Sequence, residues 1–106
     1  MYEYKFHPEA EKELKKLNKS VQILFTKTLK KILTSPELGL DLGKKNNIDL
    51  SGLKKMYFDH KRYRVVYQVL EEEIVIHLIA IGKRDKMEVY EKAGERAEKL
   101  TCTKKN

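Results

Sequence analysis

The residues best suited to chemistry lie in a basic stretch between positions 44 and 64. Seven lysines and arginines stand there against two aspartates, a local charge of +5 in a chain whose formal net charge is +7. They are Lys44, Lys45, Lys54, Lys55, Lys61, Arg62 and Arg64, against Asp49 and Asp59. Such side chains neutralise phosphates and release their counterions, so the stretch predicts a polyanionic partner. A charge run is ordinarily a solvated helix face, but this one overlaps predicted strands, which hold side chains in fixed directions.

The chain has few residues that could bind a metal ion or form a disulfide. The three histidines, His7, His60 and His77, are far apart in the sequence, and none belongs to a recognised spacing of metal ligands. Cys102 is the only cysteine, which excludes an internal disulfide. We expect no metal and no cofactor.

Length and composition favour one folded domain. The chain has 106 residues, of which 41% are hydrophobic and 37% charged, and the hydrophobic residues recur periodically. We expect a single domain over residues 1–98 and a disordered polar tail over residues 99–106. The apolar runs are too short to span a bilayer, and the N-terminus lacks the apolar core of a signal peptide. We therefore expect a cytoplasmic protein without a membrane segment.

The first third of the chain predicts a strand and a helical hairpin. Residues 2–7 alternate aromatic and polar side chains, the pattern of a half-buried strand. Pro8 suits the first turn of a helix, which ends at a break near Asn18. Ser20 is the expected N-cap of a second amphipathic helix, which ends at Pro36.

The rest of the chain predicts a loop, three strands and a last helix. Residues 35–51 lack periodicity and are expected to form a loop. Residues 52–58, 62–70 and 74–81 are rich in Val, Ile, Tyr and Phe, and their short connections allow only antiparallel pairing. The third segment is almost entirely apolar, so we expect an interior strand that is covered on both faces. A helix is expected from about Asp85 to Ala97.

These elements define an α+β fold. We expect an N-terminal strand and a helical hairpin packed on a mostly antiparallel sheet, with a C-terminal helix. We also expect all the helices to lie on one face of the sheet.

Two segments carry a family resemblance that covers most of residues 2–98. One is Tyr63–Val69, with the sequence YRVVYQV, and the other is Gly82–Tyr90, with the sequence GKRDKMEVY. Together with the order of the elements, they resemble the RelE toxins of type II toxin–antitoxin modules. The first segment is shared with the wider RelE/ParE superfamily, including the ParE gyrase inhibitors. The second is more specific, because it places an arginine and a tyrosine where ribonucleolytic RelE proteins keep theirs.

The resemblance implies a ribosome-dependent endoribonuclease that cuts mRNA and thereby inhibits translation. It places the catalytic residues at Lys55, Arg64, Arg84 and Tyr90. The residues expected to contact RNA are Lys54, Lys61, Arg62, Lys83 and Lys86. Where well-studied RelE proteins carry a second lysine, two residues after the first, this chain has Tyr57.

Metal-free RNA cleavage has three chemical requirements. The 2′-hydroxyl must lose its proton, the extra negative charge of the phosphorane must be stabilised, and the leaving 5′-oxygen must gain a proton. Arg64 and Arg84 suit the second task, since guanidinium groups offer forked donors to phosphate oxygens. Tyr90 is the candidate base, or its ring stacks on an extruded base, and Lys55 or Arg64 is the candidate proton donor. A site with such weak acids and bases depends on the ribosome for orientation.

Plainer explanations stay open for each of these residues. Lys55 is equally explained by protection of a strand edge. Function is favoured over the bracketing of a hydrophobic strand for Arg64, and over a simple place at a helix start for Arg84. Without the resemblance, packing in the core is the better explanation for Tyr90. Two other functions are also compatible with the fold: a ParE-like inhibitor of DNA gyrase, and a non-catalytic RNA- or ribosome-binding protein. The partners implied are a RelB-like antitoxin, the ribosome with its mRNA, and operator DNA only through the antitoxin complex.

Overall fold

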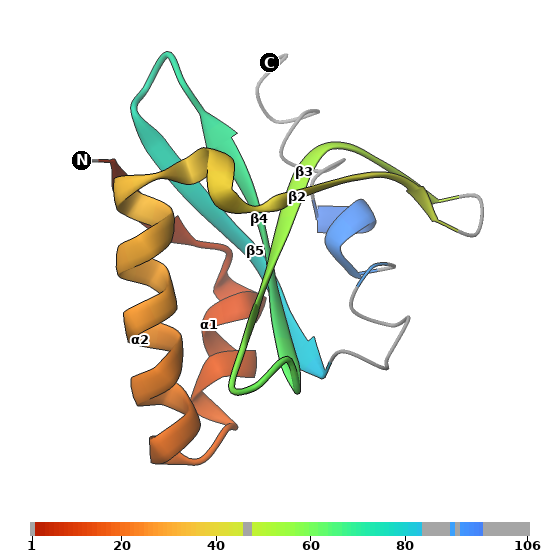
Figure 1. The fold of residues 1–106 in the computed structure, drawn as a ribbon. Coiled ribbons are helices and arrows are strands. Elements are labelled where there is room, and N and C mark those ends of the chain that lie inside the picture. The colour runs from red at the N-terminus through yellow and green to blue at the C-terminus, as the bar shows by residue number, and fades with distance from the viewer. Residues whose placement is uncertain (1, 46–47, 84–89, 91, 97–106) are drawn as a thin grey trace.

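The fold is α+β, as the sequence predicts. The structure is a computed structural model that describes residues 2–45, 48–83, 90 and 92–96 (Figure 1). Its elements in chain order are β1 (Glu3–Phe6), α1 (Pro8–Lys15), α2 (Lys19–Thr34), the 3-10 turn η1 (Pro36–Leu38), β2 (Leu40–Lys45), β3 (Ile48–Phe58), β4 (Tyr63–Leu70) and β5 (Val75–Lys83). Tyr90 and residues 92–96 are helical and are called the terminal helix below. The predicted start of this helix at Asp85, and its predicted end at Ala97, lie outside the described residues.

The sheet has five strands in the order β1-β5-β4-β3-β2. The short connections between β3 and β4 and between β4 and β5 join antiparallel neighbours, as predicted, whereas β1 runs parallel to β5. β5 lies inside the sheet between β1 and β4. Ile76, Leu78 and Ile79 of this strand are completely buried, which confirms the prediction of a strand covered on both faces.

The prediction of a loop over residues 35–51 is wrong for most of that range. Residues 40–45 form β2, and β3 begins at Ile48 rather than at residue 52. The register of this pair shifts between Asp41 and Gly43, and Gly43 has a φ of 71°. Such a bulge interrupts the alternation of side chains by which a strand is recognised. Leu42 and Leu50 nevertheless point into the core, where they are 7% and 0% exposed.

The helical hairpin begins and ends nearly as predicted. Pro8 opens α1, and the Nδ1 atom of His7 caps this helix by accepting a hydrogen bond from the N–H of Glu9 at 3.1 Å. The prediction of Ser20 as the N-cap of α2 is wrong, because the carbonyl of Asn18 already accepts from the N–H groups of Val21 and Gln22. Asn18 is therefore the N-cap, and α2 starts one residue earlier than the predicted cap.

The two faces of the sheet are covered by different helices. The face toward α2 buries a cluster that includes Phe25, Leu29, Ile32, Phe58, Val65, Tyr67, Ile76 and Leu78. The opposite face buries Leu42, Leu50, Leu53, Val66, Ile79 and Ala80 together with Tyr90 and Ala93 of the terminal helix. Figure 1 shows α1 and α2 on one side and the terminal helix on the other. The expectation that all helices share one face is therefore wrong. Among the described residues, none of the helices has the length and apolar character needed to cross a bilayer.

Candidate active site

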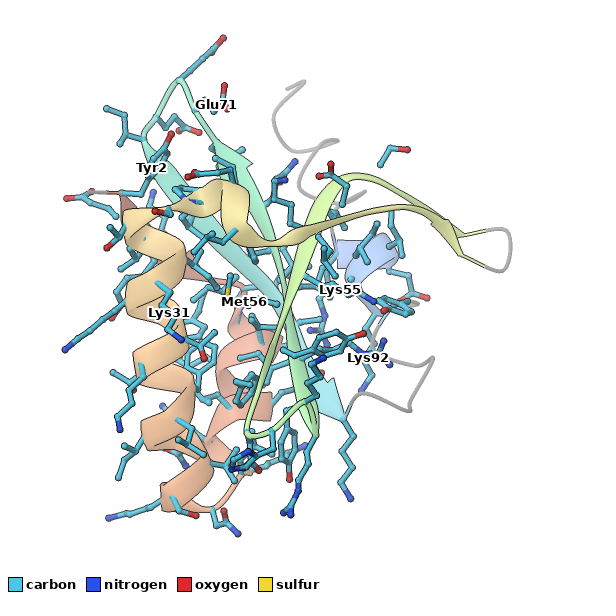
Figure 2. All side chains as sticks on the ribbon, viewed as in Figure 1. Tyr2, Lys31, Lys55, Met56, Glu71 and Lys92 are labelled. Atoms are coloured by element: carbon cyan, nitrogen blue, oxygen red, sulfur yellow. The ribbon has the colours of Figure 1, made fainter. Side chains whose placement is uncertain are left out.

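Three of the four predicted catalytic residues meet on the face covered by the terminal helix. Lys55 lies on β3 opposite Val66, and Arg64 lies on β4 opposite Tyr57, so these side chains are close neighbours on the pleated surface. Tyr90 approaches them from the terminal helix. Figure 2 shows Lys55 on this side of the sheet and Met56 on the other, as strand alternation requires. The fourth candidate, Arg84, and the predicted RNA contact Lys86 lie outside the described residues.

Tyr90 is held between two cations. Lys55 Nζ donates hydrogen bonds to the hydroxyl of Tyr90 at 3.1 Å and to that of Tyr57 at 2.8 Å. The guanidinium carbon of Arg64 lies 4.1 Å from the centroid of the Tyr90 ring, within the range of a cation–π contact. The hydroxyl of Tyr90 is therefore bonded to an ammonium group, while its ring covers a guanidinium group.

Arg64 is a buried cation in a fixed position. It is 4% exposed, and its Nη2 atom donates to the carbonyl of Lys83 at 3.4 Å. Burying a charge costs free energy unless other groups compensate for the lost hydration. A guanidinium that only bracketed a hydrophobic strand would extend into solvent. The observed position instead concentrates positive charge beneath Tyr90.

The environment of Lys55 keeps its side chain protonated. Burial alone would lower the pKa of Lys55, but the hydrogen bonds to the hydroxyl groups of Tyr57 and Tyr90 outweigh this effect and raise it. An amine whose pKa is raised from about 10.5 carries a full positive charge at neutral pH. Lys55 therefore supplies charge to the site throughout the physiological range.

Tyr57 is a member of the site that the sequence presents only as a departure from the family pattern. Its hydroxyl accepts from Lys55, and its ring centroid lies 5.0 Å from the same Nζ atom. The two-residue spacing places both side chains on one face of β3, and this periodicity is the sequence pattern that identifies Tyr57. A hydroxyl thus lies beside Lys55 where the resemblance implies a second ammonium group.

The predicted RNA contacts divide between two places. Lys61, Arg62 and Lys83 line one cavity of 630 Å³, which lies between the start of α2 and the turn after β3. Its other lining residues are Asn18, Ser20, Val21, Leu24, Asp59, His60 and Tyr63. Lys54 does not join them, because its Nζ atom forms an ion pair with Asp41 of β2 at 2.8 Å. The cavity therefore holds three of the four predicted RNA contacts that the structure describes.

The turn beside this cavity has an unusual backbone. Asp59, His60 and Lys61 have φ angles of 53°, 54° and 66°, a left-handed conformation that side chains disfavour. Three such residues in a row fix the direction in which the tip of the hairpin presents its charges. Within the described ranges, no group of three or more histidine, cysteine, aspartate or glutamate side chains is arranged to hold a metal ion.

Comparison with known proteins identifies the family. Residues 4–88 match the family model of the ParE toxin of the type II toxin–antitoxin system, parDE. A putative RelE-like toxin protein of Escherichia coli is 38% identical over 98 residues, which cover 90% of this chain and 96% of that protein. The mRNA interferase toxin RelE of E. coli K12 is 35% identical over 94 residues, which cover 86% and 92%.

Solved structures agree with the sequence comparison. The isolated E. coli RelE toxin matches with a TM-score of 0.68 and 32% identity, over 92% of this chain and 99% of that one. A chain of the intact E. coli RelBE toxin–antitoxin complex matches with a TM-score of 0.67 and 31% identity, over 81% and 100%. These matches show that the chain belongs to the RelE/ParE superfamily and is a type II toxin of the RelE family.

Proposed function

We propose that this toxin is a ribosome-dependent endoribonuclease that cleaves mRNA without a metal ion. The observation that supports this most directly is the position of Tyr90, whose hydroxyl lies 3.1 Å from Lys55 Nζ and whose ring lies over Arg64. A tyrosine that served only as core packing would have no need of two cations. The name of the E. coli relative, an mRNA interferase, points to the same reaction.

The reaction is an internal displacement at phosphorus. Tyr90 acts as a phenolate, after its hydroxyl has given its proton to solvent. The 2′-oxygen loses its proton to this phenolate oxygen and bonds to the phosphorus, and the bond from phosphorus to the 5′-oxygen breaks. Lys55, Arg64 and Arg84 stabilise the negative charge that develops on the phosphate oxygens. The leaving 5′-oxygen takes a proton from Lys55 or Arg64, and the products carry a 2′,3′-cyclic phosphate and a 5′-hydroxyl.

The burial of the site is consistent with dependence on the ribosome. Tyr90 and Arg64 are each 4% exposed, so an RNA phosphate must be brought close to the site before these side chains can act on it. A site with so little exposed surface gives slow cleavage in the isolated toxin, because free RNA seldom aligns with it. A ribosome that holds both the toxin and the message would provide this alignment.

The cations outside the site provide affinity. We propose that Lys61, Arg62 and Lys83, which line the 630 Å³ cavity, contact RNA phosphates together with Lys54 and Lys86. The protein partner is a RelB-like antitoxin, and operator DNA binds only through the complex with it. Structures of related toxins are complexes with RelB, which supports this part of the proposal. Such a toxin acts in the cytoplasm, where mRNA is translated.

Two other functions compete with this proposal. The family model that matches residues 4–88 is named for ParE, which favours inhibition of DNA gyrase as the second candidate. The third is an RNA- or ribosome-binding protein without catalysis, because Tyr57 stands where the resemblance implies a lysine. Both alternatives predict an intact message.

Primer extension on an mRNA translated in a purified bacterial system tests the proposal. The reactions contain wild-type toxin, the Arg84→Ala variant, or wild-type toxin without ribosomes. We expect cuts at regular positions within codons, only with ribosomes and only with the wild-type protein. An intact message in all three reactions would reject the ribonuclease, and a parallel DNA supercoiling assay would then test for inhibition of gyrase.

A further inference from the structure

The edge of β5 is completed by two side chains rather than by a strand. β1 pairs with β5 only from Val75 to Leu78, and the polar backbone groups beyond that point need other partners. The N–H of Ile81 donates to Glu13 Oε1 at 3.1 Å, and the carbonyl of Ile79 accepts from Arg96 Nη1 at 2.8 Å. Glu13 belongs to α1 and Arg96 to the terminal helix, so both helices meet at this edge.

The same two side chains also bind each other. Arg96 Nη1 lies 2.9 Å from Glu13 Oε1, and Nη2 lies 3.0 Å from Oε2, which is a forked arrangement. The side chains are only 11% and 16% exposed. Lys92 adds a third contact, with its Nζ atom 3.5 Å from Oε2. A forked, largely buried ion pair holds its partners in one geometry more strictly than a surface pair does.

Glu13 remains a carboxylate in this position. Burial alone would raise the pKa of Glu13, but the hydrogen bonds from Arg96 and Ile81, with the positive charges of Arg96 and Lys92, lower it overall. The forked pair is therefore intact at neutral pH.

The ion pair is linked to the site through the terminal helix. Tyr90, Ala93 and Arg96 are spaced three residues apart and form one buried stripe, at 4%, 0% and 9% exposure. Helices in proteins draw most of their stability from tertiary packing, so the position of the terminal helix depends on the contacts that hold it. Tyr90 contacts Lys55 at one end of the stripe, and Arg96 binds the edge of β5 at the other.

We propose that Glu13 and Arg96 are positioning residues for cleavage, because their ion pair fixes the terminal helix and so keeps Tyr90 over Arg64 and beside Lys55. Neither Glu13 nor Arg96 is proposed to contact RNA. The inference rests on the proposed ribonuclease function for its kinetic consequence, but the effect on Tyr90 is independent of catalysis. Glu13→Gln is the informative change, because the amide keeps the shape and an acceptor for Ile81 but loses the charge.

The kinetic test measures cleavage on ribosomes under single-turnover conditions. We expect Glu13→Gln to lower the cleavage rate constant by about tenfold to a hundredfold, with ribosome affinity unchanged. In a Tyr90→Phe background the same change should have no further effect, because the group that it positions has lost its hydroxyl. Additive losses in the double variant would overturn the proposal. Arg96→Lys, which keeps the charge but loses the fork, should behave like Glu13→Gln.

The matched control breaks an exposed ion pair on the same helix. Glu9 lies 3.5 Å from Lys12, and both side chains are more than half exposed. Glu9→Gln should therefore cleave at the wild-type rate. Circular dichroism and thermal unfolding confirm that each variant is folded before its rate is compared.

A spectroscopic experiment tests the position of Tyr90 separately from the proposed cleavage activity. The toxin is labelled with 3-fluorotyrosine, and Tyr90→Phe assigns the 19F resonance of position 90. We expect Glu13→Gln and Arg96→Lys to shift or broaden this resonance, and Glu9→Gln to leave it in place. An unchanged resonance in both variants would refute the positioning role even if the wild-type toxin cleaves. A shifted resonance in a toxin that does not cleave would refute only the ribonuclease.

Discussion

Lys55 Nζ and the hydroxyl of Tyr90 are 3.1 Å apart, although 35 positions separate the two residues in the sequence. Their hydrogen bond joins β3 to the terminal helix across the face of the sheet. It is also the contact on which the role of Tyr90 in the proposed reaction rests, since it places the phenol oxygen beside an ammonium group.

Tyr90→Phe tests the hydroxyl alone. The ring remains over Arg64, so the variant loses only the bond from Lys55, worth about 1 kcal/mol, and the melting temperature should fall by only several degrees. The cleavage rate constant should fall by about a hundredfold or more, the usual contribution of a general base. Cleavage kinetics on ribosomes and thermal unfolding measure the two quantities. Cleavage at the wild-type rate would remove Tyr90 from the mechanism.

Lys55→Met tests the ammonium group. This change removes the charge while keeping a long, flexible side chain, and we expect about a hundredfold slower cleavage, the cost of losing one preorganised donor. Lys31→Met on the exposed surface of α2 is the control, since it removes an equal charge far from the site. Equal rates in the two variants would show that only the net charge of the toxin matters.

Neutralising the cavity cations should weaken binding rather than chemistry. With Lys61, Arg62 and Lys83 changed to Gln, ribosome affinity should fall, and its dependence on salt should become less steep by about 0.7 for each phosphate that the toxin no longer neutralises. At saturating ribosome concentration the cleavage rate should stay near the wild-type value. Filter binding at several salt concentrations gives the slope. An unchanged slope would mean that these side chains do not bind phosphates.

Tyr67 provides a prediction on stability and pH. Burial raises the pKa of Tyr67 from 10.0 to about 12, and its hydroxyl donates to the carbonyl of Pro36 at 2.8 Å. Because the folded-state pKa is the higher one, the stabilisation is complete below pH 10 and is lost as the pH rises through about 12. Alkaline unfolding, followed by the absorbance of ionised tyrosine, should show this loss of stability at high pH. In Tyr67→Phe the loss that Tyr67 causes should be missing, and the variant should be about 1 kcal/mol less stable at neutral pH.

The sequence predicts those parts of the fold that local periodicity determines. β4 and β5 are recognisable because their apolar residues are continuous, and α1 because Pro8 marks its first turn. β2 escapes prediction because the bulge at Gly43 breaks the alternation within a short, charged strand. The sequence also does not predict which face of the sheet the terminal helix covers, because the pattern of an amphipathic helix is the same for either face.

The candidate site divides in the same way. Family segments and strand alternation together indicate Lys55, Arg64 and Tyr90, because these residues occupy recognisable positions in regular elements. The sequence does not predict the pair of Glu13 and Arg96, because 83 positions separate the two residues and each one lies in a helix rich in charge. Only the packing of both helices around the end of β5 brings them together.

The late position of Tyr90 has a consequence for the toxin's own synthesis. Lys55 and Arg64 are translated before Tyr90, so a chain whose synthesis stops between Arg64 and Tyr90 has both cations of the strands but lacks the tyrosine that contacts them. A message for this toxin that is cut within its coding region upstream of codon 90 yields only such incomplete chains. If the toxin cleaves messages as proposed, attack on its own transcript produces proteins without Tyr90, and its accumulation is self-limiting.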